Sequence, residues 1–101
     1  MTPEVEGRTV WVFVHARRRR GASLGEPPTH WLVEAVVWTD DRGGFHHWAG
    51  PLGTWVDYHL RASRFRSYEK AEYVAVTAAA FFRTCGAAVV EIMGLRAGSA
   101  A

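Results

Sequence analysis

The sequence predicts an α+β domain in which a mostly antiparallel sheet of four to five strands packs one face against a single α-helix at about residues 67–85. Two observations favour this class: several strand-like segments precede one helical segment, and one more strand-like segment follows it. A length of 101 residues and a hydrophobic content of 49% suit one core and leave no room for a second. We therefore expect a single domain over residues 1–101, with flexible tails at residues 1–7 and 96–101.

The first two strands are expected at residues 9–16 and 30–39, where apolar side chains fill both alternating sets of positions. Between them, residues 17–29 hold four consecutive arginines, two glycines and a Pro-Pro pair, which together predict a loop. In the first strand one face would carry Val10, Val12 and Val14 and the other Trp11, Phe13 and His15.

The chain between residues 40 and 60 predicts a hairpin followed by an extended segment. Residues 40–44, Asp-Asp-Arg-Gly-Gly, have the composition of a turn and lead into a short third strand at residues 45–49. Residues 54–60 could form a further strand or an irregular extended segment, and we assign them to a strand.

The helix is predicted from both of its ends and from the spacing of its apolar residues. Ser67 is a suitable N-cap, Glu69 places a carboxylate in the first turn, and Gly86 can end the helix with a positive φ. The β-branched run at residues 87–93 then predicts a closing strand. The helical period places one set of residues in the core: Ala71, Val74, Ala75, Ala78, Phe82 and Cys85.

A helix of this length spans about 25 Å and can cover only one face of the sheet, although the first two strands are apolar on both faces. We therefore expect an exposed aromatic sheet face that serves as a protein interface. Its candidate residues are Trp11, Phe13, Trp38 and Trp48. The alternative is that the long loop and the N-terminal arm cover this face within the monomer. The outer face of the helix is a second candidate interface, with Tyr73 and Val76 beside Arg83.

Two groups of arginines could contact an acidic partner. They are Arg17, Arg18, Arg19 and Arg20 in the predicted loop and Arg61, Arg64 and Arg66 before the helix. Guanidinium groups and a helix N-terminus both suit phosphate, so these residues predict a contact with an acidic protein surface or with nucleic acid. A net charge of +2 is low for a nucleic-acid-binding protein, and the sequence has no RRM, KH or helix-turn-helix pattern. Nucleic acid is therefore the less favoured of the two partners. The alternative is that the four loop arginines only solvate the loop and keep neighbouring edges from pairing.

No residue pattern predicts catalysis, a metal site or a cofactor. The five histidines form no HxH or HExxH pattern, and the adjacent His46 and His47 would point to opposite faces of a strand. Cys85 would lie on the core face at the negative end of the helix dipole, where a thiol is a poor nucleophile. We therefore expect a protein that is not an enzyme and that binds no metal or cofactor.

The sequence also bears on location. A single cysteine allows no internal disulfide, and the N-terminus lacks the apolar segment of a signal peptide. No apolar run approaches the roughly 20 residues of a membrane-spanning helix. We therefore expect a cytoplasmic protein without membrane contact.

The C-terminal third resembles small phage, prophage and bacterial proteins of unknown function. The resemblance lies in the segment Arg64-Phe65-Arg66-Ser67, the alanine-rich helix from Ala71, the glycine at Gly86 and the strand at residues 89–92. Each of these residues also has a structural explanation, so the resemblance carries over no functional residue. It implies a small accessory protein that acts by binding, for example an inhibitor of a host defence complex such as an anti-CRISPR protein. We expect the partner to be a second copy of the chain or a larger protein complex, with nucleic acid as the alternative.

Overall fold

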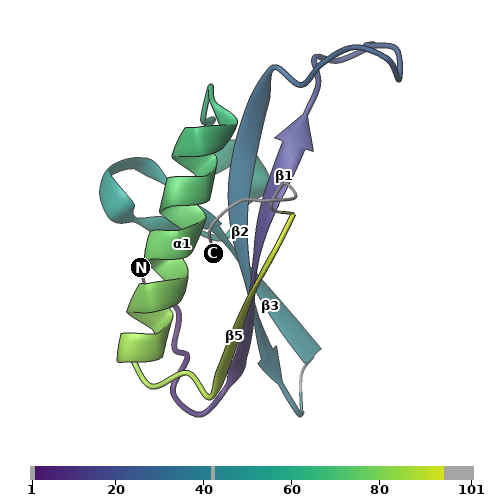
Figure 1. Ribbon diagram of the computed structural model, residues 1–101. Coiled ribbons are helices and arrows are strands. Elements are labelled where there is room, and N and C mark those ends of the chain that lie inside the picture. Colours follow the sequence, from purple (N-terminus) through teal and green to yellow (C-terminus); the bar gives the residue numbers. More distant parts are fainter. Residues whose placement is uncertain (1, 42, 95–101) are drawn as a thin grey trace.

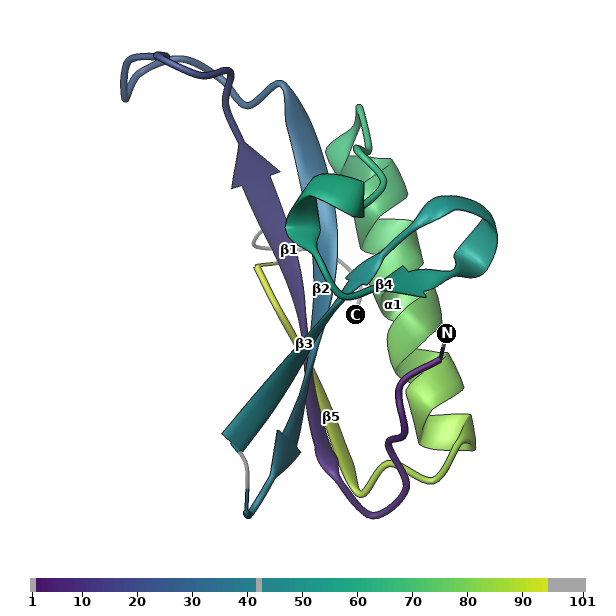
Figure 2. The same ribbon diagram turned by 180° about the vertical axis from the view of Figure 1, so that it is seen from behind.

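The computed structural model describes residues 2–41 and 43–94, which form a five-stranded sheet with one long helix on one of its faces (Figures 1 and 2). The elements are β1 (Thr9–Arg17), β2 (His30–Thr39), β3 (Gly43–Ala49), β4 (Trp55–Val56), α1 (Tyr68–Thr84) and β5 (Val89–Met93). The strand order is β4-β3-β2-β1-β5, and every neighbouring pair is antiparallel except β1 and β5. The predicted α+β class is confirmed. The predicted tail at residues 96–101 and Arg42 of the predicted turn lie outside the described residues.

Helix α1 has the ends that its sequence predicts. The Ser67 hydroxyl accepts a hydrogen bond from the backbone N–H of Lys70 at 3.1 Å, and Glu69 lies in the first turn. At the other end Gly86 adopts a φ of +92°, and the chain turns toward β5. The prediction that Cys85 lies in the core is wrong. Cys85 is the C-cap, where the backbone leaves the helical conformation, and its side chain is exposed.

The strands follow the predicted ranges closely, except near β4. β2 coincides with its prediction, and β1 and β3 extend one or two residues beyond theirs. Of the strand expected at residues 54–60, only Trp55–Val56 pairs with β3. The remainder of that prediction is wrong. Short 3₁₀ turns, η1 (Pro51–Gly53) and η2 (His59–Arg61), flank β4, and η2 folds over Trp48 instead of following β3.

The hydrophobic core lies between α1 and the sheet face that it covers. The sheet contributes mostly valine and the helix mostly alanine, and these small side chains allow close packing of the two layers. Phe82 is the largest fully buried side chain, and its ring lies 5.3 Å from that of Trp55 between centroids. The buried residues include Val10, Val12 and Val14 of β1, Val33, Ala35 and Val37 of β2, and Ala71, Ala75, Ala78 and Ala79 of α1.

The N-terminal arm packs on the helix side of the sheet (Figure 1). Pro3 and Val5 are buried, and the backbone N–H of Gly7 donates a hydrogen bond to the carbonyl of Gly86 at 2.9 Å. These contacts differ from the flexible tail expected at residues 1–7. The arm therefore lies on the side of α1 and leaves the opposite sheet face uncovered.

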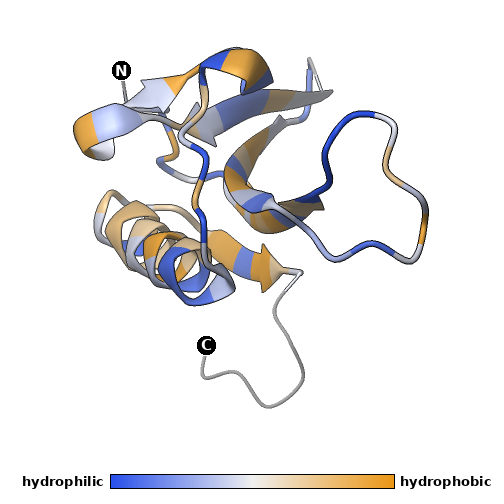
Figure 3. Ribbon diagram, turned by 90° about the horizontal axis from the view of Figure 1, so that it is seen from above, coloured by the Kyte–Doolittle hydropathy of each residue, from blue (hydrophilic) through white to orange (hydrophobic). Residues whose placement is uncertain are grey.

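The loop between β1 and β2 extends away from the body of the protein, as Figures 1 and 3 show. The Arg18 Nε donates to the Glu26 carbonyl at 2.6 Å, and the Arg19 guanidinium pairs with the Glu26 carboxylate at 2.7 Å. These contacts hold the loop in its own fold beyond the strand ends. Neither the loop nor the N-terminal arm covers the second face of the sheet.

Candidate functional site on the open sheet face

We call the sheet face opposite α1 the open face. Side chains alternate along a strand, so the register between strands fixes which of them share this face. They are Trp11, Phe13 and His15 of β1, Leu32, Glu34, Val36 and Trp38 of β2, His46 and Trp48 of β3, and Val89, Glu91 and Met93 of β5.

An apolar patch lies where β2, β1 and β5 run side by side on the open face. We define it as Trp11, Phe13, Trp38, Val89 and Met93. The rings of Trp11 and Trp38 meet edge to face, with centroids 6.0 Å apart. Trp38 is 45% exposed, and Val89 and Met93 are 46% and 39% exposed. A contiguous group of exposed large apolar side chains marks an interaction surface.

Trp48 also points to the open face, but it differs from the expectation because it is only 9% exposed. His15 and His59 lie against its ring, at centroid distances of 5.5 and 5.9 Å. Phe13 stacks on His15 at 5.6 Å, and Tyr58 contacts His59 at 4.9 Å, so a row of rings crosses the face. Residues around η2 thus cover the β3 side of the open face and leave the apolar patch exposed.

A buried carboxylate lies beside this row of rings. Glu34 is 5% exposed and accepts hydrogen bonds from His15 Nε2 at 2.9 Å and from His46 Nδ1 at 2.5 Å. One donor for each carboxylate oxygen offsets the cost of burying the charge. The sequence pattern alone did not predict this cluster. Its signal was an acidic residue inside an apolar strand, which becomes informative once the neighbouring strands are placed in register.

Arginines from the two predicted groups meet at one end of the open face, which we call the basic end (Arg17, His30 and Arg64). Arg17 pairs with His30 in the strand register, and Phe65 exchanges backbone hydrogen bonds of 2.8 and 2.9 Å with Trp31, which brings Arg64 to the same end. Burial, and then the positive charges of Arg64 and Arg17, lower the pKa of His30 below its ordinary value.

The other predicted arginines take no part in the basic end. Arg18 and Arg19 are engaged by Glu26 within the loop. Arg20, Arg61 and Arg66 are exposed as well. The predicted arginines therefore do not form one basic surface. Arg18 and Arg19 contact Glu26 within the loop, whereas Arg17 and Arg64 lie at the basic end.

The second predicted interface is the outer face of α1, which carries Tyr73, Val76 and Arg83. Tyr73 is exposed and lines a cavity between α1 and η1. Val76 is half-buried and lies on the same side of α1 as Arg83, whose guanidinium donates to the Val90 carbonyl of β5 at 3.4 Å. Tyr73 and Val76 are three residues apart on α1, so they are neighbours on its outer surface.

The described part of the chain contains no group of three or more histidine, cysteine, aspartate or glutamate side chains that could hold a metal ion. In the cluster on the open face, the Glu34 carboxylate lies between the rings of His15 and His46 and bonds to each, so the three do not converge on an ion. Over residues 2–41 and 43–94, no helix has the length and apolar character needed to cross a bilayer.

Comparison of this chain with models of known protein families, with curated proteins and with solved structures finds no match. Inference of function therefore rests on the surfaces described above.

Proposed function

We propose that this protein is a non-catalytic binding module whose open face is a protein interface, and that the partner on this face is a second copy of the chain. The apolar patch carries the proposal, because Trp38, Val89 and Met93 remain exposed on a face that α1 leaves uncovered. Aromatic residues and methionine are enriched at the centres of protein interfaces, where a partner removes their apolar area from water.

The rest of the open face is suited to burial against a partner. Each oxygen of Glu34 already accepts a hydrogen bond, so covering the carboxylate leaves neither oxygen without a donor. Glu91 lies between Val89 and Met93 and opposite Trp11, but β5 is the outermost strand, so its exposed carboxylate can reach water at that edge of the patch. A partner would therefore meet an apolar centre with charge at its margin, which is the usual arrangement of interfaces.

The distribution of charge favours a second copy as the partner. One end of the face is the basic end with Arg17 and Arg64, and at the opposite end β2 leads to Asp40, near Glu6 and Arg8. The ten residues of β2 separate the two ends by about 30 Å. If two copies pack face to face with their strands antiparallel, each basic end lies over the end of its partner that carries Asp40 and Glu6 beside Arg8, and the two basic ends stay apart.

Size-exclusion chromatography with light scattering tests the homodimer. At high micromolar concentration we expect a dimer for the unchanged chain and a shift to monomer for Trp38→Ser, which removes a large exposed ring of the apolar patch. Leu52→Ser is the matched control, because Leu52 is fully exposed but lies beside α1, away from the open face. A strict monomer in the unchanged chain contradicts the homodimer, as does equal dissociation in the two variants.

A larger protein complex is the other partner that could cover the open face, and the same two variants distinguish it from a second copy of the chain. The resemblance of the C-terminal third to small phage and bacterial accessory proteins implies such a partner. In that case the chain is monomeric, and Trp38→Ser abolishes capture of the partner from the native host while Leu52→Ser leaves it intact.

Nucleic-acid binding is a second candidate function, favoured by the meeting of Arg17 and Arg64 at the basic end. Guanidinium groups there could hold phosphates while bases stack on exposed rings of the open face. Single-stranded DNA tests it, because the affinity should fall steeply with salt. The double variant Arg17→Gln/Arg64→Gln should weaken binding more than Arg18→Gln/Arg19→Gln. The second variant removes the same charge from the loop, where Arg18 and Arg19 contact Glu26. No retention at about 50 mM salt excludes this function.

A further inference from the structure

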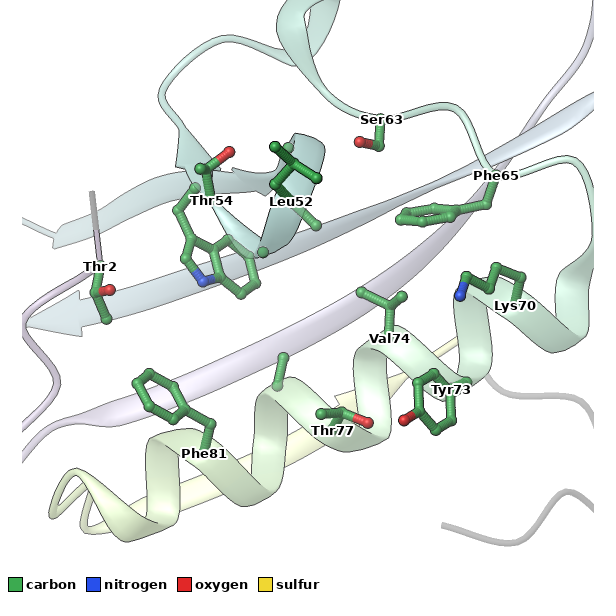
Figure 4. Close-up of a pocket in the computed structure, with 15 residues that line it drawn as sticks. Thr2, Leu52, Thr54, Ser63, Phe65, Lys70, Tyr73, Val74, Thr77 and Phe81 are labelled. Carbon is green, nitrogen blue, oxygen red and sulfur yellow. The ribbon is translucent and has the colours of Figure 1, made fainter.

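A cavity of about 490 Å³ lies between α1 and the segment that holds η1 and β4, apart from the open face (Figure 4). Cavities of this size accommodate small organic ligands, and sites for such ligands are mostly apolar with a few polar groups. Its apolar walls include Trp55, Phe65, Val74, Ala78 and Phe81. This composition matches a ligand with an apolar body.

Lys70 is the one charged side chain among the described residues that line this cavity. Figure 4 shows Lys70 toward one end and Phe81 toward the other, with Val74 between them along α1. The Lys70 amine lies 5.6 Å from the centre of the Tyr73 ring. Charge complementarity therefore favours a ligand with one negative group at the Lys70 end and an apolar remainder.

Leu52 lies at the rim of the cavity in an unfavourable backbone conformation. Its φ of 57° and ψ of 34° are in the left-handed region, which is disfavoured for a residue with a Cβ, and its side chain is fully exposed. The η1 turn holds it there through hydrogen bonds from Gly50 N–H to the Thr54 carbonyl at 2.8 Å and from Thr54 N–H to the Pro51 carbonyl at 3.0 Å. An apolar side chain fixed in this way, outside the core, suits contact with a bound molecule.

We propose that this cavity binds a small monocarboxylate with an apolar body, the carboxylate at Lys70 and the body along Val74 toward Phe81. A single lysine suits one negative charge, whereas a phosphate is better met by an arginine fork, and no arginine lines the described cavity. Leu52 covers the body of the ligand from the η1 side. Burial of apolar area against Phe65 and Phe81 supplies most of the affinity.

Calorimetric titration with decanoate, a straight-chain carboxylate, tests this site. We expect saturable binding at one site per chain, and binding about tenfold weaker in Lys70→Met, because methionine keeps an apolar side chain and removes the charge. The affinity for neutral 1-decanol should be the same in both proteins. Arg83→Met is the matched control, since it removes the same charge from the flank of α1 that contacts β5.

A second variant separates ligand binding from folding. Leu52→Gly relieves the left-handed strain, so it should keep or raise the melting temperature while weakening decanoate binding severalfold. Trp38→Ser changes only the open face and should leave decanoate binding unaltered. The proposal is overturned if decanoate binding is not saturable, if Lys70→Met and Arg83→Met weaken it equally, or if Trp38→Ser abolishes it.

Discussion

The two faces of the sheet differ more in the size of their side chains than in their apolar character. On the covered face, the buried residues that β1 and β2 place beneath α1 are valine and alanine, and the one larger apolar side chain of these strands there, Trp31, packs at the end of the helix against Tyr68. On the open face the same strands carry Trp11, Phe13 and Trp38, which keep part of their surface in water. Glu34 is buried on this face as well, so burial there does not require a helix.

The difference follows from what each face packs against. Alanines of α1, such as Ala71, Ala75 and Ala79, leave room only for small sheet side chains, because larger ones would push the helix away. On the open face no helix excludes water, and the large rings shield one another through edge and stacking contacts. Large side chains on one face of a sheet can therefore indicate where the chain's own helix is absent and a partner can pack.

The largest expected effect is a loss of stability from a substitution in the core beneath the covered face. Phe82→Ala empties a fully buried position and should lower the free energy of unfolding by about 3–5 kcal/mol, because apolar contacts are lost and a cavity remains. Phe13→Ala, on the open face, should cost clearly less because Phe13 is already partly exposed. Urea unfolding followed by circular dichroism measures both losses. Equal losses would show that the open face is packed as tightly as the core.

An intermediate effect is expected at the buried carboxylate of the open face. Glu34→Ala removes the acceptor for His15 and His46 and should lower the free energy of unfolding by about 2 kcal/mol, the scale of hydrogen bonds to a charged group. Glu91→Ala, an exposed position on the same face, should change it by no more than about 0.5 kcal/mol. Thermal unfolding of the two variants makes the comparison. If both are neutral, the cluster does not hold β1, β2 and β3 together.

The elements that the sequence predicts well are those specified by local signals. Ser67 and Gly86 end the helix through their own hydrogen bond and backbone angle, so both ends of α1 could be located from nearby residues. Alternation along β1 likewise assigns Trp11 and Phe13 to the face opposite the core. These features need no knowledge of the strand order.

The features that could not be predicted depend on residues far apart in the chain. Trp48 is covered because His59 folds back over it, and alternation along β3 carries no information about that contact. The bonds of Glu34 to His15 and His46 require three strands in a particular order and register. The cavity beside α1 likewise depends on how the helix lies relative to η1 and β4.

The smallest expected effect compares His46 and His47, which are adjacent in β3 and point to opposite faces. His46 donates to Glu34 on the open face, whereas His47 pairs with Ala35, whose side chain lies in the core. Burial, and then the neighbouring His46, lower the pKa of His47 below its ordinary value of 6.5, with Asp57 acting in the opposite direction. The two imidazoles therefore belong to the same strand but lie in the different surroundings of the two sheet faces.

The lowered pKa makes the folded protein bind fewer protons at His47 than the unfolded chain does between the two pKa values. The stability that His47 contributes is therefore complete above pH 6.5 and is lost as the pH falls through the folded pKa. Urea unfolding from about pH 7.5 down to about pH 5 should show a smaller decline in His47→Asn than in the unchanged chain. NMR titration of the His47 ring gives the direct check, and a midpoint above 6.5 would mean that the helix side of β3 does not shield this residue from water.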